Sequence, residues 1–325
     1  MNISVPQGVQ FCYEELNGSC TRITYPLSIR IPLYLFFTST VIVIVGGNIL
    51  VMITILNFEQ LQTPTNYLVF SMSVADLLLG MVVMPPNMIE SLEKCWYFGD
   101  FLCKFHASVD ITLCNASVLH LTCISIDRFC AVTKPLQYQN KMTTCVVLTM
   151  ISVSWIFSAI FGFAVIFSPS DSDPSAESVD VDCIGGCSGL HEKEIGVSYF
   201  FVFYFIPLTI MSTIYLKIFV IAIKQANTIH EINKQVRLDK NNLTKMDFKA
   251  TKTLGIIIGV FLCCWTPFFI CNIIDPIIGH SIPALLYEIL MWVAYLNSMF
   301  NPIIYAFFHT WFRKRFQILL KKCFK

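Results

Sequence analysis

The sequence predicts an all-α membrane protein: a bundle of seven transmembrane helices followed by a short amphipathic eighth helix. Only 13% of the 325 residues are charged and 55% are hydrophobic, whereas about a quarter of the residues of a soluble domain carry charge. The apolar residues also gather in long runs. A helix needs about 20 such residues to cross a hydrocarbon core, and helices are expected because backbone groups cannot remain unpaired in lipid.

The chain divides into three predicted parts. Residues 1–30 are polar and predict an extracellular tail, and they lack the basic start and apolar segment of a signal peptide. Residues 31–308 hold the transmembrane bundle with its loops, and residues 309–325 a cytoplasmic amphipathic helix and tail. The apolar runs lie at roughly 31–56, 67–90, 104–129, 145–168, 195–223, 251–274 and 284–308.

The segment after the last run is basic with an apolar stripe. It reads Arg-Lys-Arg-Phe-Gln-Ile-Leu-Leu-Lys-Lys-Cys-Phe-Lys from Arg313 to Lys325. Such a helix is expected to lie on the inner leaflet, where its basic side chains meet anionic lipid. Cys323 is a candidate site for acylation at that surface.

The basic residues predict the orientation in the membrane. With the N-terminus outside, five of the 22 Lys and Arg residues lie on the outer side and the other seventeen on the inner side. That distribution follows the positive-inside rule. The glycosylation acceptors at Asn2 and Asn17 then also fall outside. We therefore expect a multi-pass protein of the plasma membrane with an outer N-terminus.

Six of the 14 cysteines lie in the predicted outer segments: Cys12, Cys20, Cys95, Cys103, Cys183 and Cys187. Disulfides form and persist in that oxidising compartment. Six cysteines allow 15 pairings, and the residues alone leave the pairing open. A metal site at Cys183, Cys187 and His191 is the alternative for the second outer loop.

One carboxylate stands out within the spans. Asp110 lies 18 residues before Arg128, or about 27 Å along a helix, which puts it near the outer membrane face. An unpaired buried carboxylate either takes a proton or binds a cation. The outer segments hold fourteen acidic residues against five basic ones, which raises the local concentration of cations. A small organic cation is therefore the favoured ligand, and the net charge of +1 gives no reason to expect nucleic acid.

Further polar residues lie in the spans: Asp76, Ser117, Asn297 and Ser298. Carboxylate, hydroxyl and amide oxygens are the ligands that a small hard cation accepts. The sequence contains no nucleotide loop, zinc motif or nucleophile elbow. We therefore expect no enzymatic activity, no catalytic residues and no cofactor beyond a possible allosteric sodium ion.

Each span carries a marker of the rhodopsin-like G-protein-coupled receptors, which the chain resembles over nearly its whole length. The markers are Gly47-Asn48, Val74-Ala75-Asp76, Asp127-Arg128-Phe129, Trp155, Pro207 with Tyr215, Cys264-Trp265-Thr266-Pro267, and Asn301-Pro302 with Tyr305. One such motif is weak, but seven in order are specific. The resemblance implies these activation switches: Asp127, Arg128, Pro207, Tyr215, Asp247, Phe261, Trp265, Pro267, Asn301, Pro302 and Tyr305.

Within that family the chain is most similar to the trace amine-associated receptors. The segment from Asn297 to Tyr305 followed by Trp311, the Cys95-Trp-Tyr-Phe-Gly99 stretch and the Cys-Ile-Gly-Gly-Cys loop carry this resemblance. It implies an amine pocket with Asp110 as the partner of the ammonium group. The other expected ligand-binding residues are His106, Ile111, Cys114, Tyr199, Trp265, Phe268, Phe269, Trp292 and Tyr295.

The same resemblance implies a disulfide pairing and an ion site. The family's main bridge corresponds to Cys103–Cys187, and the additional bridges of trace amine receptors correspond to Cys12–Cys183 and Cys20–Cys95. Asp76, Ser117, Asn297 and Ser298 become a candidate sodium pocket. The fifth span departs from catecholamine receptors, because Tyr199, Phe200 and Phe203 stand where those receptors resemble one another in having serines.

These resemblances predict a receptor that binds small protonated trace or volatile amines and signals through a heterotrimeric G protein of the cAMP-raising type. A receptor for a classical biogenic amine such as a serotonin-like ligand is the nearest alternative. A multi-pass transporter is a further one, although the two halves show no inverted repeat. The expected partners are the amine, the G protein and membrane lipid.

Overall fold

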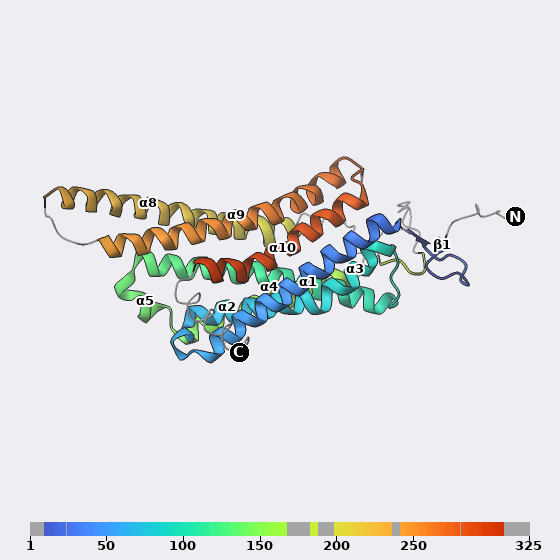
Figure 1. Ribbon diagram of the computed structural model, residues 1–325, viewed down its shortest axis with the longest axis horizontal. Coiled ribbons are helices and arrows are strands. Elements are labelled where there is room, and N and C mark those ends of the chain that lie inside the picture. Colours follow the sequence, from blue (N-terminus) through green and yellow to red (C-terminus); the bar gives the residue numbers. More distant parts are fainter. Residues whose placement is uncertain are drawn as a thin grey trace.

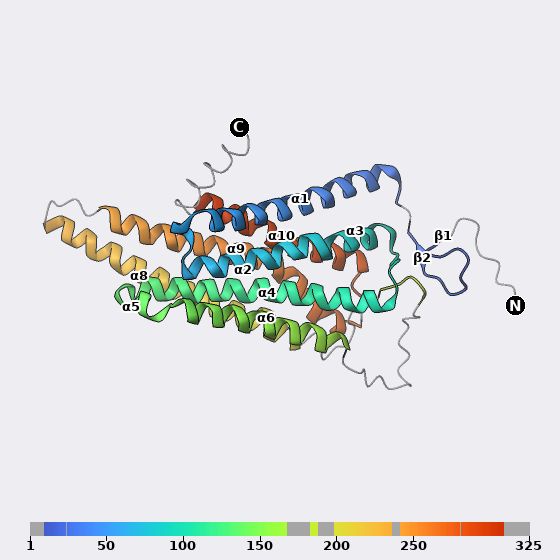
Figure 2. The same cartoon turned by 90° about the horizontal axis from the view of Figure 1, so that it is seen from below.

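The computed structural model describes residues 10–23, 25–167, 183–187, 198–235, 241–279 and 281–308. Long helices run side by side along one axis, and residues 10–23 lie at one end of the bundle (Figures 1 and 2). The predicted eighth helix with Cys323, and the acceptor Asn2, lie outside the described residues. For Asp247 and Tyr305 the structure describes the backbone only.

Each of the seven predicted runs coincides with a helix. The first is α1 (Leu27–Asn57), and the second comprises α2 (Pro64–Leu78), a π-helical turn (Leu79–Val83) and α3 (Met84–Glu93). The third and fourth are α4 (Asp100–Thr133) and α6 (Thr144–Phe167). The last three are a π-helical turn (Phe201–Phe205) continued by α8 (Ile206–Gln235), α9 (Asn241–Ile277) and α10 (Ala284–Phe308).

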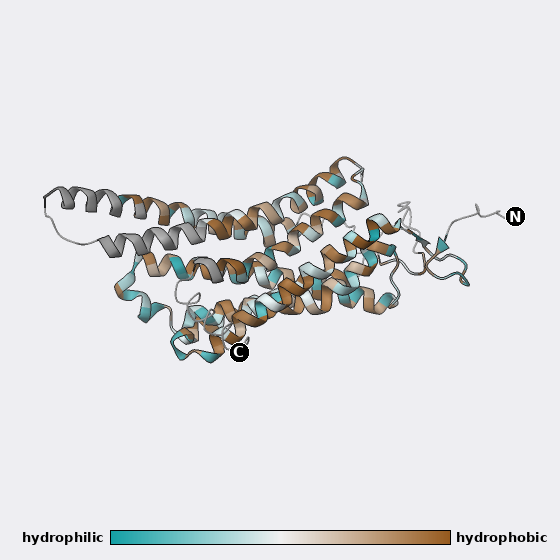
Figure 3. Cartoon of the chain, viewed as in Figure 1, coloured by the Kyte–Doolittle hydropathy of each residue, from teal (hydrophilic) through white to brown (hydrophobic). Residues whose placement is uncertain are grey.

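Six helices of the described part are long and apolar enough to cross a membrane, and α10 runs alongside them with 25 residues. Hydrophobic residues follow the helices along most of their described length (Figure 3). Large apolar side chains remain exposed on their outward faces, such as Leu35, Ile42 and Ile160, at 64–66%. A soluble protein rarely exposes such continuous apolar surface, so this surface faces lipid.

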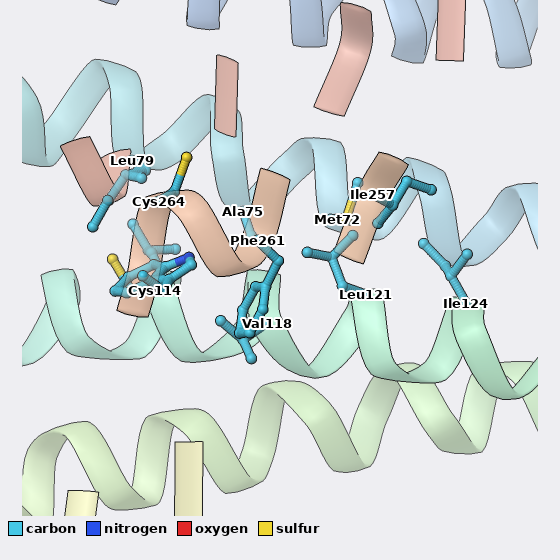
Figure 4. Close-up of a cluster of buried hydrophobic side chains, with 14 of the residues drawn as sticks. Met72, Ala75, Leu79, Cys114, Val118, Leu121, Ile124, Ile257, Phe261 and Cys264 are labelled. Carbon is cyan, nitrogen blue, oxygen red and sulfur yellow. The ribbon is translucent and has the colours of Figure 1, made fainter. Parts of the chain in front are cut away.

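The interior of the bundle is packed from several spans. Met72, Ala75, Leu121 and Phe261 meet in one buried cluster of α2, α4 and α9 (Figure 4), and Met72, Ala75 and Phe261 are fully inaccessible. Close helix contact also depends on Gly162. A Cβ atom there would lie 2.4 Å from the Thr112 hydroxyl oxygen and 2.8 Å from a carbonyl oxygen of α4.

A buried polar chain joins three of these helices. The Trp155 indole N–H donates to the Ser71 hydroxyl at 2.9 Å, and Ser71 lies 2.9 Å from Nε2 of His120. The other ring nitrogen of His120 lies 2.6 Å from the Ala116 carbonyl oxygen, so it carries the proton. The polar atoms of these three side chains are therefore all paired, as burial requires.

A small ribbon of two strands, β1 (Gln10–Phe11) and β2 (Thr21–Arg22), covers the outer end of the bundle. Ser19 of the intervening turn forms a bridge with Ile184 of the second outer loop. Asn17 lies exposed in the same turn, so its acceptor side chain is accessible. At the inner end, α5 (Pro135–Lys141) connects α4 to α6 and was not predicted from the sequence.

Three disulfides join the described segments at the outer end of the bundle, and two of them differ from the predicted pairing. Cys103–Cys187 is present as expected. The predicted bridges Cys12–Cys183 and Cys20–Cys95 are wrong, because the structure contains Cys12–Cys95 and Cys20–Cys183. The register of the ribbon explains the exchange: the Cys20 N–H donates to the Ile184 carbonyl at 3.0 Å, which puts Cys20 beside Cys183. A metal site at Cys183 and Cys187 is excluded, since both sulfurs are in disulfides.

Candidate functional site

Asp110 lies on α4 with its carboxylate turned toward α10. The Tyr295 hydroxyl donates to Oδ2 at 2.6 Å, and the Cys114 thiol, one turn further along α4, lies 3.4 Å from Oδ1. Asp110 is half-buried and Tyr295 is 2% exposed. Among the described residues no Lys, Arg or His forms an ion pair with Asp110. The carboxylate is therefore held in place by neutral donors, without a cationic partner in the described part of the chain.

Asn87 of α3 belongs to the same cluster and was missed in the sequence. Its amide nitrogen donates to the Tyr295 hydroxyl oxygen at 2.7 Å, so Tyr295 receives one hydrogen bond and passes another to Asp110. The π-helical turn Leu79–Val83 immediately precedes α3 and changes the direction of the side chains that follow it. The sequence did not single out Asn87, because it is an uncharged amide next to Pro85 and Pro86. Any polar residue at that depth of a span is nevertheless a candidate for ligand binding.

Aromatic rings of α9 and the fifth span form a further cluster, whose Tyr199 interacts electrostatically with Asp110. Phe269 is 2% exposed and lies 5.8 Å from Trp265, 5.7 Å from Phe268 and 5.4 Å from Tyr199, between ring centroids. Tyr199 also meets Phe203 at 5.6 Å. The structure thus brings together four of the aromatic residues expected to bind the ligand.

Other predicted ligand residues have more varied surroundings. Trp292 stacks on Phe37 of α1 at 3.9 Å and donates to the Ser91 hydroxyl at 3.1 Å, so its indole is turned toward α1 and α3. His106 lies one turn above Asp110, and its Nε2–H donates to the Val83 carbonyl at 3.1 Å. Ile111 is half-buried beside Asp110.

Ion pairs lie at the outer mouth of the site, meaning the outer ends of α1, α3 and α10. Glu93 binds two cations, Arg22 at 2.8 Å and Arg30 at 3.1 Å, and Lys94 pairs with Glu288 of α10. Burial lowers the pKa of Lys94, and the negative charge of Glu90 partly offsets that effect. Arg22, Arg30 and Lys94 are therefore engaged by acids of the mouth itself.

Asp76 forms a second polar cluster deeper in the bundle. Its Oδ1 accepts hydrogen bonds from the Ser117 and Ser298 hydroxyls, both at 2.8 Å, and its Oδ2 accepts one from the Asn301 amide at 2.8 Å. Asn297 was predicted here, but its buried amide nitrogen has no hydrogen-bond partner in the described part of the chain. Asn301, one turn along α10, makes the contact instead.

The inner end of α4 holds a third cluster. Asp127 is inaccessible to solvent and pairs with its neighbour Arg128 at 3.0 Å. It also accepts hydrogen bonds from Thr65 at 2.9 Å and from Tyr138 of α5 at 2.7 Å. Burial raises the pKa of Tyr138. The expected contact of Arg128 with Asp247 lies outside the described side chains.

The proline and aromatic residues predicted as activation switches lie on α8, α9 and α10. Pro302 of α10 packs against α1, where a Cβ atom on Gly47 would come within 2.9 Å of its ring. The Tyr215 ring lies against Gly255 of α9, 3.0 Å from the position of a Cβ atom. Trp265 and Phe261 are buried in α9, and no partner of the Trp265 indole nitrogen lies among the described residues.

The model of a family described as 7 transmembrane receptor (rhodopsin family) matches residues 47–305. Trace amine-associated receptor 1 of Macaca mulatta is 43% identical over 316 residues, which cover 95% of this chain and 94% of the relative. Trace amine-associated receptor 7e of Rattus norvegicus is also 43% identical, covering 96% and 88%. Trace amine-associated receptor 1 of Mus musculus is 41% identical, covering 98% and 97%.

These matches cover the seven spans, and their sequence identity of 41–43% is higher than a shared fold alone requires. They exclude the transporter alternative, and they identify a receptor rather than an enzyme. The chain therefore belongs to the rhodopsin family of seven-transmembrane receptors, multi-pass proteins of the plasma membrane, and within it to the trace amine-associated receptors.

Proposed function

We propose that this receptor binds a small protonated amine and transmits the binding to a heterotrimeric G protein. The observation that supports this proposal is the Asp110 carboxylate, which Tyr295 and Cys114 hold in place and which has no cationic partner among the described residues. A shielded ammonium–carboxylate contact is stronger than a surface ion pair. The names of the relatives, which refer to trace amines, point to the same ligand class.

The body of the ligand is proposed to be apolar or aromatic. Tyr199 interacts electrostatically with Asp110, and its ring contacts Phe269, which in turn contacts Trp265 and Phe268. Such rings pack on an apolar body and also attract its cationic head. The rings of Tyr199 and Phe203 occupy the part of the fifth span where a catechol would need hydroxyl partners. A simple amine is therefore favoured over a catecholamine, and a serotonin-like amine is the alternative.

Transmission is proposed to pass through the proline-containing spans. Proline removes a helix hydrogen bond, so Pro207, Pro267 and Pro302 mark places where a span can bend. A ligand that packs on Trp265 favours one arrangement of α9 over another. At the inner end the same change would separate Arg128 from its acidic neighbours and open a surface for the G protein. We expect the cAMP-raising type of G protein.

The Asp76 cluster is proposed to bind a sodium ion that modulates this equilibrium. The carboxylate and two serine hydroxyls offer the hard oxygen ligands that such an ion prefers. Asn301 holds the second carboxylate oxygen and orients the group. Asn297, on the same helix, supplies a buried amide that has no hydrogen-bond partner among the described residues.

The remaining assignments concern modification and the tail. Asn17 is proposed as a glycosylation site because it is exposed in the outer turn. Asn2 as a second acceptor, Cys323 as an acylation site and residues 309–325 as an amphipathic helix rest on the sequence alone.

The experiment that tests the ligand class is a panel of amines applied to cells that express the receptor. Each amine is paired with the alcohol of the same carbon skeleton, which lacks the positive charge. We expect responses to amines only, measured as cAMP accumulation and with sensors for the other G-protein types. Responses of equal size to the alcohols would reject a cationic ligand.

A further inference from the structure

A cavity of about 240 Å³ lies beside the outer half of α4, on a different face from Asp110. Leu102, Phe105, His106 and Val109 form one of its walls. Their i, i+3, i+4, i+7 spacing places them on one stripe of the helix. Asp110 is the next residue after Val109, so its side chain leaves α4 about 100° further round the axis.

The second span and the loop after it form the rest of the wall. Val82 and Pro86 come from the span, and Trp96 and Phe98 from the loop. The rings of Trp96 lie 5.1 Å from those of Phe98 and of His106, so these three residues make a continuous aromatic wall. The cavity is therefore built by packed side chains of three segments.

The rim of the cavity faces lipid. Val82 and Leu102 are each 47% exposed and Phe105 is 42% exposed. Phe105 also meets Phe163 of α6 edge-on at 5.9 Å, on the flank of the bundle. Figure 2 shows α3, α4 and α6 following one another along that flank. The cavity is thus continuous with the surface through which this receptor meets the bilayer.

The lining presents no accessible hydrogen-bonding group to a polar ligand, because its exposed surface is entirely apolar. The two polar groups of the wall already have partners. The Trp96 indole N–H donates to the Gly99 carbonyl at 3.0 Å, and the His106 Nε2–H donates to the Val83 carbonyl at 3.1 Å. Water would therefore lose hydrogen bonds there, and apolar cavities of about 150 Å³ stay dry and bind benzene.

We propose that this cavity is a second binding site, which takes a hydrocarbon chain of an outer-leaflet lipid. The stripe from Leu102 to Val109 spans about 10 Å of helix, near the outer end of the third span. A lipid chain reaches it sideways from the bilayer and fills space that no side chain of the wall occupies. The site does not include Asp110 and shares only His106 with the expected amine-binding residues, so the lipid proposal does not depend on the proposed function.

The test uses the purified full-length receptor in nanodiscs of phosphatidylcholine that contain a trace of lipid with a diazirine on its acyl chain. After illumination, labelled peptides are identified by mass spectrometry. We expect the label to concentrate on the segments around Val82 and around residues 102–109, several-fold above other lipid-exposed segments. Val109→Phe fills the cavity and should lower labelling there several-fold.

Val153→Phe is the matched control, because Val153 is 59% exposed on α6 and does not line the cavity. It should leave the labelling unchanged. If Val109→Phe lowers the melting temperature of the receptor, Leu102→Trp at the exposed rim replaces it in the comparison. Even labelling over all lipid-exposed segments, or equal labelling of the filled and control variants, would overturn the proposal.

Discussion

Replacing Tyr295 by phenylalanine removes one hydroxyl group from the Asp110 site and leaves the ring in place. That hydroxyl donates to the Asp110 carboxylate at 2.6 Å and accepts from Asn87 at 2.7 Å. A hydrogen bond to a charged group contributes about 1.5–3 kcal/mol. Since each 1.4 kcal/mol is tenfold, we expect the half-maximal amine concentration to rise about 10- to 140-fold. The ionised carboxylate that the ammonium needs is then less well stabilised, and Asn87 is left without its acceptor.

Tyr287→Phe provides the control for this experiment. Tyr287 lies on the same helix, and its hydroxyl contacts the Cys271 carbonyl at 3.0 Å and interacts with Asp275 rather than with Asp110. Both variants are compared with the parent receptor at equal surface expression, by concentration–response curves for one amine. A shift below about threefold for Tyr295→Phe, or an equal shift for both variants, would refute the idea that Tyr295 positions Asp110 for the ligand.

Three more changes have defined expectations. Gly162→Ala should lower the melting temperature of the purified receptor, because overpacking costs about 1–3 kcal/mol. Gly259→Ala should leave it unchanged, because no neighbouring atom lies within 4 Å of the Cβ position there. Equal melting temperatures of the two variants would contradict the close contact of α4 and α6. Asp76→Asn should abolish any effect of sodium on amine potency in washed membranes, and a persisting sodium effect would move the ion elsewhere. Non-reducing peptide mapping should recover Cys12 linked to Cys95, and peptides that join either cysteine to another partner would reject the pairing described.

The spans were predictable because a transmembrane helix is a local property of the chain. A run such as residues 145–168 needs only its own apolar residues to identify it, and the structure has α6 at Thr144–Phe167. Asp110 was also predictable, since a lone carboxylate in a span is rare enough to stand out. Both predictions depended on residues close together in the sequence.

The parts that were missed depend on contacts between distant segments. The pairing of Cys20 with Cys183 follows from a bridge between an outer turn and a loop more than 160 residues away, and no local pattern encodes that register. Asn87 reaches Tyr295 across two helices, after a π-helical turn that the sequence did not reveal. Asn301 was recognised only as a switch motif, and its contact with Asp76 became apparent once α10 was placed beside α2.

The measurement that decides the proposed function is the amine response of Asp110→Asn beside the parent receptor and Asp110→Glu, at matched surface expression. Asparagine keeps the shape of the side chain and removes its charge, whereas glutamate keeps the charge. Loss of one partner of a buried charge pair costs about 2–5 kcal/mol, so potency should fall about 30-fold or more with asparagine and recover in part with glutamate. An unchanged amine potency in Asp110→Asn would show that this carboxylate does not bind the ligand.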